Sequence, residues 1–541
     1  MQGLKMRFLA PLGIVLLAIV SHCQGQGFDP TVGATPENLA AVSQSVTNLA
    51  QKISLAIANP KSKTEIFSPV SIAGALSLLL LGSGGNTRDE LMNVMGFQHS
   101  RLTFTDIHKS FGRLFQDLVS NDPAQNVTIP WRANDKCNNN DYDYEDYAQS
   151  KPTGQQRGRR DTDNPVEIRV GNGIFAVTGR EFDRKYQYIA EKIYRIETQY
   201  LDFENKTQYA IRTINDWVRS QTRGKITEIV SHLNPDTMLV IANTLYLKAE
   251  WEEPFLRDGT KPRPFFPDGP NRPSINVPMM VHGGCFPYYY WKDMQTKVIG
   301  IPYKQYSTMY VFLPDESNRA KVRALQNKID ADEMNKIIRN MDVKTASIQF
   351  PKMHVQNSFN LKQVLEQLGG SSIFDREKSD LYRVLTNLTR LGGGEEPDID
   401  DALDFLEDTR ANAELELKNS FGQDCVVIEK EVESAQKCPS SDCRYGGGQC
   451  VCCAQFTKGR KRRQAQYNAD KKSPLYVNEV MHKVDVVVNE KGTEGGAVTA
   501  TLLDRITPLI NFKANGPFLI LIREEATQLP LFYGTVYDPT P

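Results

Sequence analysis

Apolar residues recur at helical spacing near the start of the chain. Thr35, Pro36 and Glu37 form a helix start, because a cap residue precedes proline at the first helical position and an acid in the first turn. The apolar positions that follow are separated by three or four residues and predict one buried helical face: Val42, Val46, Leu49, Ile53 and Ile57.

Two later segments have the pattern of strands. The segment from Met238 to Leu247 is mainly apolar and partly β-branched, which predicts a buried strand. Val484, Val486 and Val488 alternate with less apolar positions, which predicts a strand with one apolar face. Helical and strand patterns are both abundant, so the chain is expected to have an α+β fold.

Composition narrows the class of protein. The 541 residues include 64 Lys and Arg against 65 Asp and Glu, a formal net charge of -1. A dedicated nucleic-acid binder would need a basic surplus, so no nucleic-acid partner is expected. Hydrophobic residues make up 40% of the chain, enough to bury a large core without disulfide support.

The N-terminus has the layout of a secretory signal. A basic start at Lys5 and Arg7 precedes an apolar run from Phe8 to Val20, which polar and small residues end. We therefore expect residues 1–25 to be a signal peptide, with an N-terminal anchor as the alternative, and a mature secreted protein without a membrane partner. Three glycosylation sequons agree with secretion: Asn126, Asn205 and Asn387.

Cysteines gather in one part of the chain. Cys23 lies at the signal boundary, and Cys137 and Cys285 stand alone. The other six fall within 29 residues and predict a local disulfide knot of open pairing: Cys425, Cys438, Cys443, Cys450, Cys452 and Cys453. A zinc site is the less favoured reading, because paired C-x-x-C units and a histidine are missing from the cluster.

Two polar, charge-blocked stretches interrupt the patterned sequence. They span residues 121–163 and 385–472 and read as long exposed insertions. The second opens with an acidic piece that holds eight acids and no base between Glu395 and Asp408. Basic clusters ending at Arg160 and Arg463 resemble furin-type processing sites; binding of sulfated glycans by these basic loops is the alternative.

Signatures of catalysis are missing from the sequence. We find no G-x-S-x-G elbow, H-E-x-x-H, P-loop or G-x-G-x-x-G motif, and the seven histidines have no metal-like spacing. The chain is therefore expected not to be an enzyme and to need no cofactor or metal.

Eight short motifs, in order along the chain, resemble those of the serpin family. They are Ile66-Phe-Ser-Pro-Val-Ser-Ile72, Asn172-Gly-Ile-Phe175, Ile214-Asn-Asp-Trp-Val218, Asn243-Thr-Leu-Tyr-Leu-Lys248, Phe350-Pro-Lys352, His482-Lys483, Glu490-Lys-Gly-Thr-Glu494 and Pro530-Leu-Phe-Tyr-Gly534. The resemblance covers residues 35–541 apart from the two insertions. It implies a single domain with three β-sheets, eight or nine helices and an exposed reactive loop near the C-terminus.

The resemblance also implies a mechanism, suicide inhibition of a serine protease by loop cleavage and insertion into the central sheet. The hinge residues suit insertion, since alternate positions from Thr493 to Leu503 are uncharged and free of proline. Glycines stand where the family commonly has alanines, which should slow insertion. The hinge comprises Glu490, Gly492, Thr493, Glu494, Gly495, Gly496 and Ala497.

The reactive bond has two candidates. The family's usual register places it between Ile506 and Thr507, whereas the chemistry favours Arg505-Ile506, because a cationic side chain fits the specificity pocket of a trypsin-like protease. By the same resemblance, five residues are candidates for controlling sheet opening: Ser68, Ser71, Asn243, His482 and Trp251. For the first four, a satisfied structural network is an equal reading.

The sequence therefore predicts a monomeric, secreted inhibitor of a trypsin-like serine protease. The alternative is a non-inhibitory member of the family that acts as a binding scaffold, a carrier or the precursor of a cysteine-rich peptide.

Overall fold

The computed structural model describes residues 33–120, 129–133, 166–386, 475–493 and 510–541, with the backbone of three short strands between residues 425 and 452. The chain divides into two compact units. One contains Met1–Val32 and Glu396–Asn468, and the other contains Gly33–Glu395 and Ala469–Pro541.

In the described residues the larger unit has ten α-helices, eight of which are nine residues or longer. They are α2 (Pro36–Ala56), α3 (Pro69–Gly82), α4 (Gly85–Met95), α5 (Phe104–Ser120), α6 (Pro130–Ala133), α8 (Arg184–Tyr194), α9 (Thr207–Gln221), α10 (Arg319–Lys328), α11 (Ala331–Arg339) and α12 (Lys362–Gln367).

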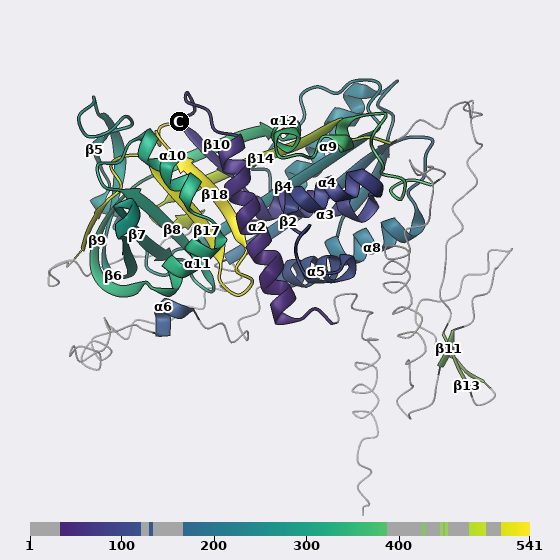
Figure 1. Cartoon of the computed structure of the whole chain (residues 1–541), viewed down its shortest axis with the longest axis horizontal. Helices are drawn as coiled ribbons and strands as arrows, with labels where there is room; N and C mark the ends of the chain where they lie inside the picture. The colour runs from purple at the N-terminus through teal and green to yellow at the C-terminus, as the bar shows by residue number, and fades with distance from the viewer. Residues whose placement is uncertain are drawn as a thin grey trace, which may run out of the picture. The chain divides into compact units, whose positions relative to one another are not determined.

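The predicted first helix is confirmed as α2. Thr35 caps it by accepting a hydrogen bond from the Asn38 amide, and its apolar face is buried as expected except at Ile57, a half-buried residue that already caps the C-terminal end. α2 crosses the last strands of the chain with α3, α4 and α5 beside it (Figure 1). Every residue of the apolar α3 is buried, so this helix is the centre of the core.

A six-stranded sheet carries both predicted strands. Its order is β10 (Met353–Asn360), β14 (Glu479–Asn489), β15 (Gly492–Thr493), β4 (Leu239–Glu250), β2 (Val166–Val177) and β3 (Glu197–Leu201). Burial alternates residue by residue along β14, and its three predicted inward valines are completely buried. The period-two pattern therefore identified the correct face.

The second large sheet has nine strands. They are β1 (Thr64–Phe67), β18 (Pro530–Val536), β17 (Phe518–Glu524), β8 (Ser307–Pro314), β7 (Thr296–Pro302), β6 (Ile275–Trp291), β9 (Asp342–Pro351) and β16 (Ile510–Lys513) in order, with β5 (Lys261–Phe265) on β6. The expected three sheets are therefore not separate here. The 17-residue β6 pairs successively with β5, β9 and β7, and so it joins two of them.

The chain ends meet in this sheet. β1, near the start of the described chain, pairs along its whole length with β18. The Tyr537 amide also donates to the Lys63 carbonyl at 2.8 Å.

The described residues show where packed structure borders the second insertion. Leu385 is 1% exposed and forms a bridge with Phe182, and the Thr386 amide donates to the Glu181 carbonyl. Leu385 and Thr386, the first residues of the predicted insertion, thus belong to the packed structure, and Leu475, beyond its predicted end, is buried as well.

The smaller unit contains a three-stranded sheet. β13 (Gln449–Cys452) lies between β11 (Cys425–Val427), which is parallel to it, and the antiparallel β12 (Arg444–Gly446). This register places Cys425 across from Cys450 along the backbone. The side chains of the six clustered cysteines lie outside the described residues. None of the helices described combines the length and apolar character needed to cross a bilayer.

Candidate functional site

The two central strands of the six-stranded sheet, β14 and β4, are parallel and pair directly at only one end. Glu479 to His482 pair with Val240 to Asn243. At the other end β15 lies between them, antiparallel to both, with Thr493 opposite Val488 and Ala249. The sheet is therefore already parted at the end where the predicted hinge begins.

Thr493 is held inside this gap. The residue is only 2% exposed, and its hydroxyl shares a 2.9 Å hydrogen bond with the Tyr303 hydroxyl. The Tyr303 ring stacks on Trp251 with centroids 4.2 Å apart. Because both rings are completely buried, they form a rigid wall against which the first hinge residue packs.

The turn before β15 is fixed by hydrogen bonds to its backbone. The Trp251 indole N–H donates to the Asn489 carbonyl at 2.9 Å, and the Trp251 amide donates to the Lys491 carbonyl at 2.9 Å. The Phe255 amide donates to the Glu490 carbonyl at 2.8 Å. Trp251, assigned from sequence to the opening of the sheet, thus holds the chain on both sides of Glu490.

Glu490 adds a charged contact. Its carboxylate lies 3.0 Å from Lys352 Nζ and accepts a 2.8 Å hydrogen bond from the Thr260 hydroxyl. Burial alone would raise the pKa of Glu490, but the hydrogen bonds from Lys352, from its own backbone and from Thr260 outweigh burial and lower it. The hinge therefore starts from a carboxylate that stays ionised.

Gly492 makes the close approach of β15 to β4 possible. A Cβ at this position would lie 2.1 Å from the Ala249 carbonyl oxygen, and φ is +151°. A side chain cannot be accommodated unless the two strands separate.

Beneath the direct β14–β4 pairing lies the predicted polar cluster. The Ser68 amide donates to His482 Nε2 at 3.0 Å, and the Ser71 hydroxyl donates to Asn243 Oδ1. The Asn243 amide in turn donates to Asn172 Oδ1, so a residue of β2 completes the cluster. Since His482 and Asn243 are paired across the two strands, these bonds tie the last closed part of the sheet to α3.

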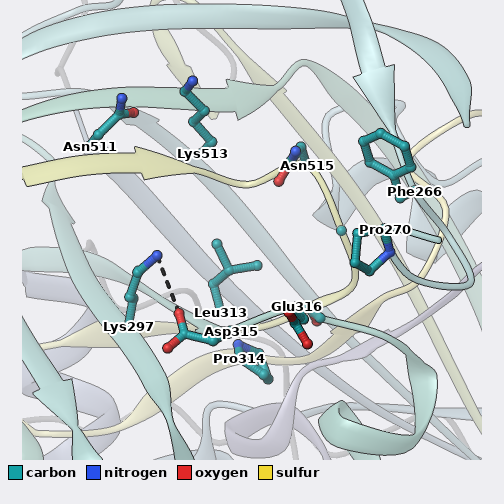
Figure 2. A pocket seen from close by; sticks show the side chains of 12 residues that line it. Phe266, Pro270, Lys297, Leu313, Pro314, Asp315, Glu316, Asn511, Lys513 and Asn515 are labelled. Atoms are coloured by element: carbon teal, nitrogen blue, oxygen red, sulfur yellow. Dashed lines mark ion pairs between the residues drawn. The ribbon is translucent and has the colours of Figure 1, made fainter.

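A pocket of about 390 Å³ lies beside β16, the first described segment after the candidate reactive bond. Asn511 and Lys513 border it from β16, and Lys297 forms an ion pair with Asp315 at 3.2 Å across its floor (Figure 2). No histidine or cysteine lines it. Nor do the described residues contain a group of three or more His, Cys, Asp or Glu placed to hold a metal ion.

Several predicted site residues fall outside the described chain. These are the hinge residues from Glu494 to Ala497, the candidate bonds at Arg505, Ile506 and Thr507, the sequons Asn126 and Asn387, and the processing candidates Arg160 and Arg463. Asn205 is described and exposed on the surface.

Sequence reasoning missed three contributors. Tyr303 lies in no motif, and Asn172 begins a family motif without having been given a role, because only the tertiary fold brings them to the hinge and to the polar cluster. Cys285 is disulfide-bonded, although the sequence pointed only to the six clustered cysteines.

Comparisons with known proteins agree with this architecture. Human kallistatin superposes with a TM-score of 0.63 at 22% identity, over 93% of this chain and 99% of that chain. Human thyroxine-binding globulin superposes with a TM-score of 0.63 at 19% identity, over 93% and 100%. The fold is thus that of the serpins.

A family model described as serpin (serine protease inhibitor) matches residues 44–394 and 455–539. This chain therefore belongs to the serpin family, a family of protease inhibitors and not of enzymes. Serine protease inhibitor 28Dc of Drosophila melanogaster is 30% identical over 505 residues, 92% of this chain and 79% of that protein. Alpha-1-antitrypsin 1-3 of Mus musculus is 25% identical over 476 residues, 88% and 83%.

The buried His482 predicts a loss of stability in mild acid. Burial lowers the pKa of His482 to about 3 from its ordinary value of 6.5, so below pH 6.5 the unfolded chain binds a proton that the native protein does not. Between pH 7.5 and 5.5 this should remove about 1 kcal/mol from the free energy of unfolding. In urea titrations, His482→Gln should lose that part of the pH dependence, whereas the surface variant His232→Gln should keep it. An unchanged pH dependence in His482→Gln would contradict this assignment.

Gly492→Ala should release β15 from β4, because the new methyl group overlaps the Ala249 carbonyl. Hydrogen exchange followed by mass spectrometry should show faster exchange at Thr493 in the variant. Gly179→Ala is a matched control, since φ is also positive there, +91°, but nothing lies within 4 Å of the added carbon. Equal protection of Thr493 in wild type and Gly492→Ala would show that the hinge pairing is not as described.

Proposed function

We propose that this chain is a secreted suicide inhibitor of a trypsin-like serine protease, which acts by cleavage of its reactive loop and insertion of the loop into the six-stranded sheet. The observation that carries the proposal is β15. Its two residues already occupy the position of an additional strand between β14 and β4. Continued pairing in the same direction would draw the following residues into the sheet.

The register of β15 supports this route. If the antiparallel pairing continues by two residues at a time, Gly495 comes opposite Val486, and Ala497 opposite Val484. Thr499 then comes between His482 and Asn243, the pair that the polar cluster holds closed. Because directly opposed residues share a face, the small uncharged positions of the hinge would all face the core.

The hinge positions that would face outward are also compatible with insertion into the sheet. The same register places Glu494 across from Lys248, which favours opposite charges on the outer face. Gly495 and Gly496 cost about 0.5–1 kcal/mol each in a strand, which would slow insertion without blocking it. Each added residue pairs antiparallel on both sides, which is slightly more stable than the parallel pairing of β14 with β4.

The chemistry follows from the family's mechanism. The protease's serine oxygen attacks the carbonyl carbon of Arg505, the bond to the Ile506 nitrogen breaks, and the new amine takes a proton as it leaves. Arg505 then stays on the protease as an ester. Insertion of the freed segment would carry the protease away and distort its site before water hydrolyses that ester.

The identity of the target is inferred from Arg505. A guanidinium suits the acid-bottomed specificity pocket of trypsin-like proteases, whereas cleavage after Ile506 would suit an elastase-like pocket.

Secretion is supported by the predicted signal peptide and by the surface position of Asn205, which is the acceptor of a glycosylation sequon. Sulfated glycans are possible ligands of the basic loops at Arg160 and Arg463.

A second candidate function draws on the smaller unit. Glu396–Asn468 belongs to that unit and contains both the six clustered cysteines and the basic cluster that ends at Arg463. A precursor that releases a cysteine-rich peptide, or a binding scaffold that carries it, would use this arrangement and would not need loop insertion.

Incubation with a trypsin-like protease should separate the two functions. The wild-type protein should form a covalent band that survives SDS, and Thr493→Arg should be cleaved without forming that band, because a charge cannot enter the buried site of Thr493. Glu494→Gln, at an outward position, should keep the band. Clean cleavage of the wild-type protein with recovery of active protease would favour the scaffold or precursor.

The reactive bond can be read from the released C-terminal fragment. Mass spectrometry should find a fragment that begins at Ile506, and Arg505→Ala should lower the rate of complex formation by at least tenfold. Ile506→Ala should have a much smaller effect. A fragment that begins at Thr507 would assign the bond to Ile506 instead.

A further inference from the structure

A short part of the first insertion is built into the core. Ile129 and Trp131 are each 4% exposed, although the sequence on both sides of residues 129–133 is polar. The Trp131 indole N–H donates to the Tyr310 hydroxyl at 3.0 Å, and that hydroxyl donates to Glu525 at 2.7 Å. The insertion is therefore attached to the nine-stranded sheet by buried contacts and not only by its two ends.

The same segment contacts the hinge end of β4. Arg132 Nη2 lies 2.6 Å from Glu252 Oε2, and Glu252 directly follows Trp251. The ion pair is partly exposed and contributes little energy alone, but it fixes the position of α6. Ala133, the last described residue of this segment, is thus located close to Glu252.

Cys285 lies near the same place. Glu253, the residue after Glu252, has its carboxylate 3.5 Å from His282 Nε2. A Cβ built on Gly284 would lie 3.2 Å from that carboxylate. Cys285 follows Gly284 in β6 and pairs with Thr345 of β9, a strand that α6 also contacts.

We propose that the disulfide partner of Cys285 is Cys137, and that this bond staples the first insertion to the sheet beside the hinge. Cys285 is disulfide-bonded, and Cys137 follows Ala133 by four residues, which can span about 13–14 Å when extended. A disulfide bridges a further 4.4–6.8 Å or so between Cα atoms. This span suits a bond to Cys285, because β9, the strand with which Cys285 pairs, contacts α6.

The cysteine count agrees with this pairing. The cluster from Cys425 to Cys453 contains six cysteines, an even number that can pair within itself. Removal of the signal peptide would take away Cys23. Cys137 and Cys285 are then the two that remain.

The pairing of Cys137 with Cys285 determines what cleavage at the basic cluster ending at Arg160 would produce. Arg160 lies between Cys137 and β2, so cleavage there would produce two chains that the disulfide keeps together. The new chain end would lie a few residues before Val166, which pairs with Ala249, the residue that also pairs with Thr493. Processing would therefore place a free chain end just before β2, while the residues before the cut stay attached through the disulfide. This inference does not depend on the proposed inhibition.

Peptide mapping of the full, non-reduced protein is the direct test. Digestion should yield one peptide pair that joins the segments around Cys137 and Cys285 and disappears on reduction. A link from either cysteine to a member of the cluster, or a free thiol at Cys137, would overturn the proposal.

A gel provides a second readout that needs no variant. A sample nicked after Arg160 should run as one band without reductant and as two bands with it; separation into two bands without reductant would contradict the pairing. For stability, Cys137→Ser, Cys285→Ser and the double variant should show the same lowered Tm, since all three remove one bond. Additive losses in the double variant would mean that the two cysteines belong to different bonds.

Discussion

The architecture of the six-stranded sheet depends on one short interaction, the parallel pairing of β14 with β4. These strands are neighbours in the middle of the six-stranded sheet, yet only four residue pairs join them directly. A short turn cannot join two parallel strands, because the end of one and the start of the next lie at opposite ends of the strands. The Ser68–His482 and Ser71–Asn243 bonds tie the closed end of this pair to α3. At the other end, where the strands are parted, β15 packs against the Trp251–Tyr303 wall.

These two ends have opposite effects on a strand that enters the sheet. At the hinge end, β15 is accommodated by a glycine with no side chain and by a hydroxyl partner for Thr493. At the other end, buried polar groups are paired with each other, and separating them leaves a buried donor or acceptor without a partner. His482 illustrates the constraint: Nε2 accepts a hydrogen bond, so the ring proton is on Nδ1, which has no partner among the described residues. The sheet therefore already accommodates the two residues of β15, and a longer inserted strand would meet the paired polar groups where Thr499 enters.

Local sequence patterns predicted the elements but not their contacts. The cap and spacing of α2 and the alternating valines of β14 depend only on neighbouring residues, and both predictions are confirmed. The family motifs identified the fold, which the comparisons confirm. The joining of two expected sheets through β6 was not predicted, because a 17-residue strand with Pro278, Gly283, Gly284 and Pro287 does not have the pattern of a continuous strand. Tyr303, Asn172 and the bond of Cys285 were missed because each depends on residues that are distant in sequence.

The pairing of β1 with β18 also determines when the protein can fold. Ribosomes deliver the N-terminal part first, but β17 and β18, which separate β1 from β8, lie much later in the sequence than β1. Until they emerge, β1 lacks the strand with which it pairs, and α3 lacks its contacts with β18. The nascent chain must therefore be translated through β18 before this sheet can close, and the unpaired edge of β1 is prone to aggregation until then. Truncation of even the final strand should consequently be far more harmful than loss of an equally long piece elsewhere on the surface.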